Sequence, residues 1–408
     1  MLARTFPVGT DRSLSKEMTM SPTKYAPAGR VADLLREGQS LWLDSISRHL
    51  MDSGDLDRLI GETGIRGITS NPTIFEKAIN GSSDYDADIA ALSGKKLSSS
   101  DIIRTLMVKD VQRACDFFRP VYESSKTLDG FVSIEVNPLL AHETEASVAE
   151  ARTLHRMVDR PNLLVKIPGT KEGIPAIRQL ISEGISVNVT LLFSPEAYRQ
   201  SAQAYIDGLK TYQAGGGDPS KIRSVASLFI SRLDTLIDKK IDAIASGATD
   251  PSLAQKAKDL RGKAGIANTR IVYELFGTLF SSANFGALAK AGATVQRPLW
   301  ASTGTKDPAY PDTLYVDNLI GPDTVNTVPF ETLRAFADHG TISRTIDRFS
   351  KGKPGEDPHL ILDALATLGI SLEAAYNQLI TEGVQSFNKS FESLMESTER
   401  KIASKKGA

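Results

Sequence analysis

Short runs rich in β-branched and apolar residues recur along this chain, and longer stretches with helical spacing of apolar residues separate almost all of them. Such alternation is typical of parallel sheets, and eight runs favour a closed (β/α)8 barrel. An open doubly wound sheet is an alternative, but it usually has a glycine-rich phosphate loop after its first strand, which is missing here. The expected strands are residues 40–45, 67–71, 130–136, 162–168, 186–193, 224–231, 296–302 and 314–319.

Several intervals between these runs are too long for one helix. Residues 72–129 are expected to hold at least two helices, one of them over 98–122, and residues 232–290 two or three, with a polar break near 246–250. After the eighth run, residues 329–399 predict further helices, broken at Gly340 and at 351–358. The sequence therefore predicts a TIM barrel with additional helices in insertions and at the C-terminus.

The same patterns set the expected domain bounds. Residues 1–28 are polar and lack periodicity, which predicts a disordered leader, and the basic end at 400–408 is expected to be a solvated tail. Residues 29–399 are expected to form a single barrel domain, since one barrel with insertions can reach this length.

Composition excludes several classes of function. The 408 residues carry 48 basic and 49 acidic side chains, so no global field attracts nucleic acid or a membrane surface. A single cysteine, Cys115, rules out an internal disulfide and fits a reducing compartment. No apolar run approaches the roughly 18 residues of a membrane helix, and no secretory signal is visible. We therefore expect a cytoplasmic protein.

Cofactor motifs are also missing from the sequence. The five histidines show no metal-binding spacing, and neither GxGxxG nor GxxxxGK[ST] occurs. We expect neither a metal nor a nucleotide cofactor.

Lys166 is the most informative polar residue of the strand-like runs. It lies between Val165 and Ile167, where burial would favour the neutral amine that attack on a ketone carbonyl requires. The alternative is a strand lysine whose stem packs while its ammonium group reaches solvent. These two interpretations remain about equal from the short stretch alone.

Two carboxylates occupy comparable positions. Alternation places Asp44 and Glu135 on the interior faces of their strands, near the ends at which barrel enzymes carry their sites. A Schiff-base aldol reaction needs such groups to move protons. The alternative is an ion-paired cluster that holds the barrel mouth together. Asn71 and Asn188 suit recognition of a polyol, although an interior asparagine is more often a satisfied structural amide.

Candidates for phosphate recognition follow the sixth and seventh runs. Arg232 comes after the sixth run, behind Ser227, and the segment ASTGTK at 301–306 follows the seventh with hydroxyls, a glycine and Lys306. Barrel enzymes often bind phosphate with such late loops, and a guanidinium matches phosphate oxygens. Either cation could instead be an ordinary surface salt-bridge partner.

Taken together, these segments resemble transaldolases in their longer bacterial form. The likeness spans roughly residues 38–330, and the combination of motifs in this order is highly specific. The matching segments are LWLDS at 41–45, GITSNPTIF at 67–75, SIEV at 133–136, VKIP at 165–168, GISVNVTLLF at 184–193 and SLFISR at 227–232.

The resemblance implies a role for each matching residue. Lys166 corresponds to the Schiff-base lysine, Asp44 to the acid/base at the C4 hydroxyl of the donor, and Glu135 with Thr190 to the pair that activates a water. The resemblance implies that Asn71, Asn188, Ser227 and Phe229 line the dihydroxyacetone site, and that Arg232 and Ser302 bind phosphate.

One position departs from the family's pattern. The family usually has a second phosphate-binding arginine two residues beyond the serine, where this chain has Gly304. We expect Lys306 to take the place of that arginine.

The implied activity is transfer of a dihydroxyacetone unit between small-molecule sugar phosphates, from sedoheptulose 7-phosphate or fructose 6-phosphate to glyceraldehyde 3-phosphate or erythrose 4-phosphate. It needs no cofactor and belongs to the non-oxidative pentose phosphate pathway, and we expect a monomer or homodimer. One rival is a fructose-6-phosphate aldolase, whose relatives tend to carry Gln in place of Glu135 and Tyr in place of Phe229. Another rival is a catalytically silent barrel that binds sugar phosphates.

Overall fold

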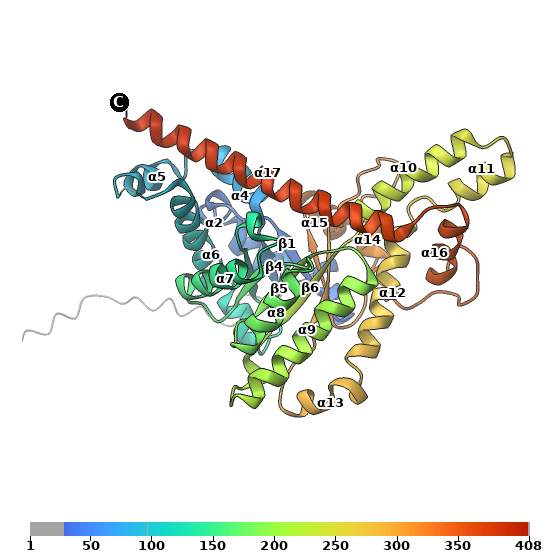
Figure 1. Ribbon diagram of the computed structural model, residues 1–408, viewed down its shortest axis with the longest axis horizontal. Helices are drawn as coiled ribbons and strands as arrows, with labels where there is room; N and C mark the ends of the chain where they lie inside the picture. The colour runs from blue at the N-terminus through green and yellow to red at the C-terminus, as the bar shows by residue number, and fades with distance from the viewer. Residues whose placement is uncertain (1–27, 96, 407–408) are drawn as a thin grey trace, which may run out of the picture.

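Eight parallel strands close into a barrel in the order of the sequence, as the computed structural model of residues 28–95 and 97–406 shows (Figure 1). Each strand pairs with its neighbours along the chain, and β8 closes on β1. This confirms the predicted (β/α)8 barrel. The predicted leader, residues 1–28, lies outside the described residues except for Ala28. The strands are β1 (Gln39–Asp44), β2 (Gly67–Thr69), β3 (Phe131–Glu135), β4 (Leu163–Pro168), β5 (Val187–Leu192), β6 (Ser224–Phe229), β7 (Arg297–Ala301) and β8 (Thr324–Val328).

Large side chains fill the barrel interior, which is therefore a packed core. Trp42, Leu164 and Leu299 are fully buried in one apolar cluster. Gly67 accommodates Trp42, because a β-carbon at position 67 would lie 2.6 Å from the indole ring. Small polar side chains such as Ser133 and Asn188 are buried within the strands as well, but the packed interior leaves space for a ligand only at the barrel mouth.

The prediction of the eighth strand was wrong. Residues 314–317 form the short helix α14 (Leu314–Asp317), and the strand lies farther on, at Thr324–Val328. Residues 314–319 begin with three apolar residues, and a run this short cannot be assigned to strand or helix by periodicity alone. The true strand looks polar because Asn326 and Thr327 are among its five residues, and both are buried.

The helices surround the barrel and fill the insertions. Three helices occupy residues 72–129, where at least two were predicted. The break at Gly247–Asp250 matches the predicted one. Residues 232–290 hold parts of four helices, whereas two or three were predicted. The α-helices are α1 (Arg30–Arg36), α2 (Arg48–Asp52), α3 (Asp55–Arg58), α4 (Pro72–Asn80), α5 (Asp86–Ser93), α6 (Ser99–Ser124), α7 (Thr144–Val158), α8 (Gly173–Ser182), α9 (Pro195–Ala214), α10 (Ser231–Gly247), α11 (Pro251–Lys258), α12 (Ala264–Leu279), α13 (Ser282–Lys290), α14, α15 (Phe330–His339), α16 (Pro358–Thr367) and α17 (Leu372–Lys406). Shorter turns are the π-helix η1 (Leu59–Thr63) and the 3-10 helices η2 (Pro138–Leu140) and η3 (Pro219–Lys221).

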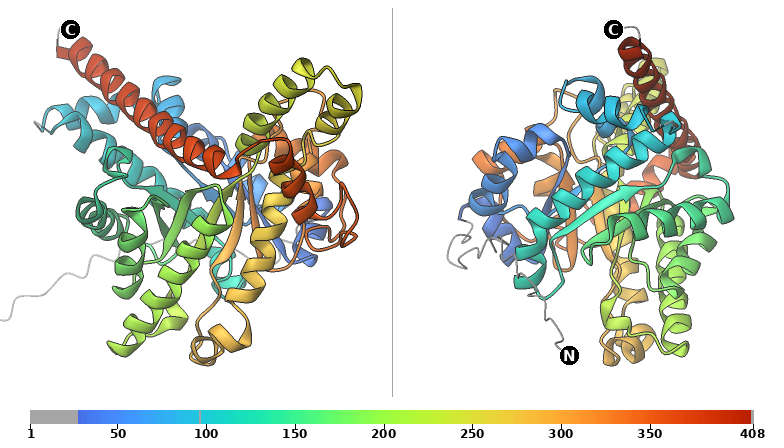
Figure 2. Two further views of the ribbon diagram at one scale, coloured as in Figure 1. Left: turned by 45° about the vertical axis from the view of Figure 1, so that its right-hand side comes forward. Right: turned by 90° about the vertical axis from the view of Figure 1, so that its left-hand side faces the viewer.

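The long helix α17 runs across one end of the barrel, from the neighbourhood of α10 to α4, α5 and α6 (Figures 1 and 2). Polar bonds tie it to α4: the Thr73 and Ser390 hydroxyls are 2.7 Å apart, and Ser393 donates to Glu76 at 2.6 Å. The predicted tail is therefore wrong for residues 400–406, which continue this helix. Lys401 donates to the carbonyl of Ile79 at 2.9 Å, a contact that sequence periodicity could not reveal.

Within residues 28–95 and 97–406, no single helix has the length and apolar character needed to span a membrane. Pro358–Thr367 and the part of α17 up to Ala403 pass that test only as a pair, with a bend of 96° between them. Several apolar residues of this pair, such as Leu365, Leu379 and Leu394, are buried against the rest of the protein, whereas Leu360 is exposed.

Candidate active site

A cavity of about 220 Å³ lies at the carboxyl ends of the barrel strands and beneath α17. Polar side chains from seven of the strands or the turns that follow them converge on it, as parallel strands in a closed barrel require. Sequence reasoning had selected most of its lining residues. These are Asp44, Asn71, Lys166, Thr190, Ser227, Phe229, Arg232, Ser302 and Lys306, and the lining also includes Thr69, Ala301, Gly304, Thr327, Pro329 and Phe387.

Lys166 lies inside the barrel, because its side chain points inward from the buried strand β4. The residue is 4% exposed, and its Nζ donates to the backbone carbonyl of Ser70 at 3.1 Å. The carboxylate of Glu135, on the adjacent strand, lies 3.6 Å from the same nitrogen. A lysine whose head reaches solvent is therefore excluded, and the amine is presented to an enclosed space.

Glu135 is buried without the donors that a structural carboxylate normally has. Neither of its oxygens accepts a hydrogen bond from any residue in the described part of the chain, since Lys166 remains at ion-pair distance. Burial raises the pKa of Glu135 to about 7, against the opposing effect of Lys166. Thr190 also has a buried hydroxyl oxygen without a partner among these residues. The carboxyl group can thus gain and lose a proton near neutral pH.

Asp44 occupies the end of β1 and is half-buried. The Thr69 hydroxyl donates to its Oδ1 at 2.5 Å, and the Thr69 and Thr327 hydroxyls are 2.7 Å apart. This arrangement orients the carboxylate into the cavity that Lys166 also lines. Thr69 lay within a recognised motif, whereas Thr327 was missed because it belongs to the misplaced eighth strand.

Asn188 does not line the cavity itself but lies behind Ser227, which does, in a chain of hydrogen bonds that also includes Ser133. Asn188 donates to Ser133 at 3.0 Å and accepts from Ser227 at 2.7 Å, so the structural interpretation of this amide holds at least in part. Asn71 caps α4, because its Oδ1 accepts from the backbone of Ile74 at 3.0 Å. Both asparagines are therefore fixed in position before any ligand arrives.

The opposite wall of the cavity is cationic. Arg232 stacks on the rings of Phe229 and Phe387, at 5.1 and 6.0 Å from their centroids. Within the described residues, no carboxylate comes within 4.0 Å of its guanidinium, so it is not a salt-bridge partner. Burial lowers its pKa, and the nearby carboxylates, led by Asp44, oppose that shift.

The loop after β7 completes this cationic wall. Ser302 has a left-handed backbone, with φ of 56°, and its hydroxyl is 2.8 Å from that of Ser231. Lys306 is exposed at the rim. Gly304 packs against Pro329 and Thr332, and a β-carbon there would lie 3.2 Å from each. A side chain at position 304 would need these neighbours to shift. The cation of this loop lies two residues later, at the exposed Lys306.

Two features of the site were not predicted from the sequence. Phe387 reaches the cavity from α17, far beyond the last strand. A bulge in β5 gives Leu191 a left-handed φ of 58°, directly after Thr190, and turns its side chain toward Gly383 of α17. Phe387 reaches the cavity through tertiary packing, whereas the bulge is a local feature of β5. No signal in the sequence predicts either of them.

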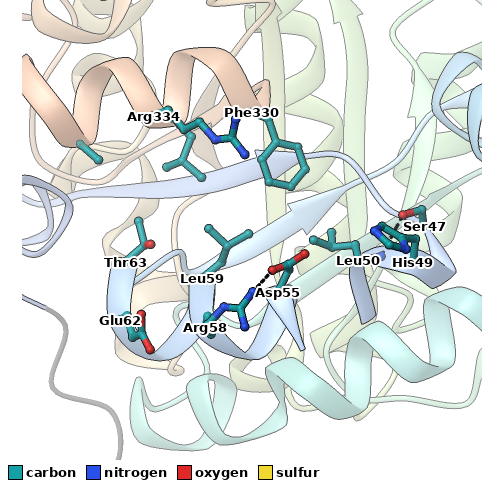
Figure 3. Close-up of a pocket in the computed structure, with 12 residues that line it drawn as sticks. Ser47, His49, Leu50, Asp55, Arg58, Leu59, Glu62, Thr63, Phe330 and Arg334 are labelled. Carbon is teal, nitrogen blue, oxygen red and sulfur yellow. Dashed lines mark hydrogen bonds and ion pairs between the residues drawn. The ribbon is translucent and has the colours of Figure 1, made fainter. Parts of the chain in front are cut away.

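Larger hollows lie elsewhere, so volume alone does not locate the site. One of about 440 Å³ lies between α2, α3, η1 and α15 on the outer surface (Figure 3). It contains an exposed ion pair between Arg58 and Asp55, with Phe330 on the facing helix. None of the residues selected from the sequence lines it. No group of three or more potential metal ligands occurs in the described ranges.

Comparisons with known proteins show which sequences this chain is similar to. A sequence model described as transaldolase/fructose-6-phosphate aldolase matches residues 41–398. A transaldolase from Trichodesmium erythraeum is 47% identical over 369 residues, covering 90% of this chain and 95% of its own. A transaldolase from Saccharopolyspora erythraea is 47% identical, and a protein named transaldolase 2 from Streptomyces avermitilis is 48% identical. They cover 90% of this chain and 95% and 96% of their own lengths.

Proposed function

The chain belongs to the transaldolase/fructose-6-phosphate aldolase family, and we propose that this enzyme transfers a dihydroxyacetone unit between sugar phosphates through an imine on Lys166. The donors are sedoheptulose 7-phosphate or fructose 6-phosphate, and the acceptors are glyceraldehyde 3-phosphate or erythrose 4-phosphate. The observation that carries the proposal is a buried amine, 3.6 Å from an otherwise unbonded carboxyl group, in a polar cavity. Nucleophilic catalysis requires such a pair.

Imine formation is the first step. The neutral amine of Lys166 attacks C2 of the ketose, and the carbinolamine then loses its C2 oxygen as water. Glu135 has a pKa of about 7, so it can deliver the proton that this water needs and later receive one. Thr190 has an unpartnered hydroxyl and holds the departing water beside that carboxyl group.

Carbon-carbon cleavage follows from the protonated imine. Asp44 removes the proton of the C4 hydroxyl, the C3–C4 bond breaks, and its electron pair passes to the iminium nitrogen to give an enamine. The hydrogen bond from Thr69 fixes the Asp44 carboxylate in the required orientation. The aldose leaves, and the enamine carbon attacks the carbonyl of a second aldose by the reverse sequence. Exclusion of water protects the enamine between these steps.

The remaining residues bind the substrate. Asn188 and Ser227 form a fixed hydrogen-bonded pair under the dihydroxyacetone portion, while Asn71 and Phe229 line the walls. The phosphate of the sugar lies against Arg232, whose guanidinium is free for bidentate bonding. Ser302 and the exposed Lys306 complete the phosphate site from the loop after β7. Here Lys306 substitutes for a cation that Gly304 cannot supply.

The experiment is reduction by borohydride in the presence of fructose 6-phosphate. We expect a stable adduct on a peptide that contains Lys166, and an adduct on another lysine, or none, would overturn the proposal. Assays with and without erythrose 4-phosphate separate a transferase from an aldolase. Glu135 and Phe229 favour the transferase, so product should form only when the acceptor is present.

We also propose the cellular setting. A net charge of −1 gives the enzyme no general attraction to nucleic acid or membranes, and a cytoplasmic location matches its place in the non-oxidative pentose phosphate pathway. It acts without a metal or organic cofactor, as a monomer or homodimer, from a single catalytic domain that extends past residue 399 along α17. Sedimentation at micromolar concentration distinguishes the two states.

A further inference from the structure

A second cavity of about 440 Å³ lies at the periphery, between the start of α12 and the segment that leads into α16. We call it the peripheral cavity. Its volume is in the range of small-molecule binding sites. The residues used below are Arg261, Lys263, Arg270, Tyr310, Arg348 and Phe349.

The peripheral cavity has a surplus of positive charge. Four cations line it, against the single carboxylate of Glu356, and that carboxylate forms an ion pair with Lys353. Arg261 is also engaged, since it contacts Asp242 and bonds to Asp307 at 2.6 Å. The other three cations have no carboxylate within 4.0 Å in the part of the chain that the structure describes. These are Lys263, Arg270 and Arg348.

Arg270 is the cation whose lack of an acceptor is most costly, because part of its guanidinium is buried. Its Nε has no acceptor among the described residues, and its Nη2 donates to the carbonyl of Thr345 at 3.3 Å. The guanidinium stacks on Phe349, 5.5 Å from the ring centroid, and burial lowers its pKa while Glu356 opposes that shift. Burying a charged donor without a partner is unfavourable, so a site of this kind is completed by an anion.

We propose that the peripheral cavity binds a phosphate-bearing small molecule, held by Arg270, Lys263 and Arg348. The fork of an arginine matches phosphate oxygens, and two further cations suit an anion with more than one negative charge. Phe349 and Tyr310 provide the flat apolar walls that such pockets normally combine with a few charged groups. The chain as a whole is nearly neutral, so it does not attract anions in general. An anion would therefore bind here because of the local surplus of positive charge.

The peripheral cavity is distinct from the catalytic one, but the loop after β7 contributes to both. Lys306 lines the catalytic cavity, and Tyr310 lines the peripheral one. Two further contacts tie this loop to the helices around the peripheral cavity. Asp307 accepts from Arg261, and Tyr310 donates to Asp238 at 2.6 Å. A ligand in the peripheral cavity therefore lies against the back of the loop that carries a proposed substrate-binding cation.

Isothermal titration of the full chain with inorganic phosphate, pyrophosphate and AMP tests the proposal. The three probes separate a free inorganic anion from a nucleotide. The test variant is Lys263→Glu combined with Arg348→Glu, because neither side chain is buried and the fold should persist, which thermal melting checks. Lys290→Glu changes an exposed lysine on α13 and serves as the control for charge. Arg232→Ala reports on binding in the catalytic cavity.

We expect at least one probe to bind wild type, Lys290→Glu and Arg232→Ala with similar affinity, and to bind the double variant at least tenfold more weakly. Tighter binding of AMP than of pyrophosphate would identify a nucleotide, and the reverse an inorganic anion. The proposal is wrong if no probe binds wild type, if the double variant binds like Lys290→Glu, or if Arg232→Ala removes all binding. Borohydride trapping on Lys166 is independent of each of these results.

Discussion

The two ends of the barrel each bury an acidic side chain beside a basic one, but only at one end is the carboxyl group fully hydrogen-bonded. At the amino ends of the strands, Asp129 accepts from Ser40 at 2.8 Å and Arg297 at 3.1 Å, with Arg66 at 3.6 Å. At the carboxyl ends, Glu135 has no hydrogen bond from the described residues, and the amine of Lys166 lies 3.6 Å away.

This difference separates a structural charge from a reactive one. A carboxylate surrounded by donors has little tendency to change protonation state, and it fixes the strands that contact it. A buried carboxylate without donors is unstable in its charged form. It therefore lowers the stability of the fold and accepts a proton more readily. Barrels in general place stability at the amino ends and catalysis at the carboxyl ends, and here the hydrogen bonds of two acidic residues show the same division.

Loss of the reactive amine should have the largest effect. We expect Lys166→Met to lower kcat/KM by roughly 10⁴-fold, about 5.5 kcal/mol, as for other covalent nucleophiles. The coupled assay with fructose 6-phosphate and erythrose 4-phosphate measures this loss. Lys171→Met, at an exposed position shortly after β4, is the control and should retain full activity. Substantial turnover by Lys166→Met would mean that this end of the barrel does not contain the nucleophile.

Removal of the structural carboxylate should instead act on stability. Asp129→Ala leaves Arg66 and Arg297 without their buried partner, and we expect the free energy of unfolding to fall by about 3–5 kcal/mol. Urea unfolding measures the loss, while activity per folded molecule should remain near that of wild type. Asp116→Ala breaks only an exposed pair with Arg160 and should cost less than about 1 kcal/mol. Equal losses in the two variants would remove the distinction between the ends.

Glu135→Gln should stabilise the protein in a pH-dependent way. The pKa of Glu135 is about 7 in the folded state, above its ordinary value of 4.5, so the folded state binds more protons between these values and loses stability as the pH rises through them. Relative to wild type, the variant should therefore gain roughly 3 kcal/mol between pH 4 and pH 8.

Urea titrations at several pH values measure this gain. The exposed Glu123→Gln is the control, with no such trend. If the free energy of unfolding depends on pH in the same way for Glu135→Gln and wild type, the pKa of the carboxyl group at the barrel mouth is not raised by folding. The activity of Glu135→Gln should fall by about 10²- to 10⁴-fold, since it loses a proton-transfer group.

The smallest effect is expected at the exposed rim. Lys306→Ala should raise KM for fructose 6-phosphate about fivefold, close to 1 kcal/mol, because an exposed ion pair is screened by solvent. KM for unphosphorylated dihydroxyacetone should change little, and Lys290→Ala should change neither constant. The same increase for both substrates would show that Lys306 does not contact phosphate.

Local alternation in the sequence was sufficient to predict the inward-facing groups of the early strands. Asp44, Glu135 and Lys166 stand out because each is polar near the end of an apolar strand. In the structure, Asp44 and Lys166 line one cavity, and Glu135 lies beside Lys166. The family resemblance supplied the roles of Thr190 and Ser302, which spacing alone could not.

Features that depend on distant packing were not predictable in this way. The eighth strand was displaced because Asn326 and Thr327 make it look polar, and the reason for that polarity is visible only once the barrel closes. Phe387 lies on an amphipathic helix whose sequence does not reveal what it covers. The raised pKa of Glu135 likewise depends on the absence of donors, which no residue type records.

The position of Phe387 also bears on how the enzyme is made. This wall of the cavity comes from α17, which follows the final barrel strand by more than one intervening helix. On a translating ribosome, all eight strands leave the exit tunnel before Phe387 does, so the barrel can close while Lys166 is still uncovered. We therefore expect the cavity to be completed late in biosynthesis, and a product that terminates early, before α17, to have an open barrel mouth.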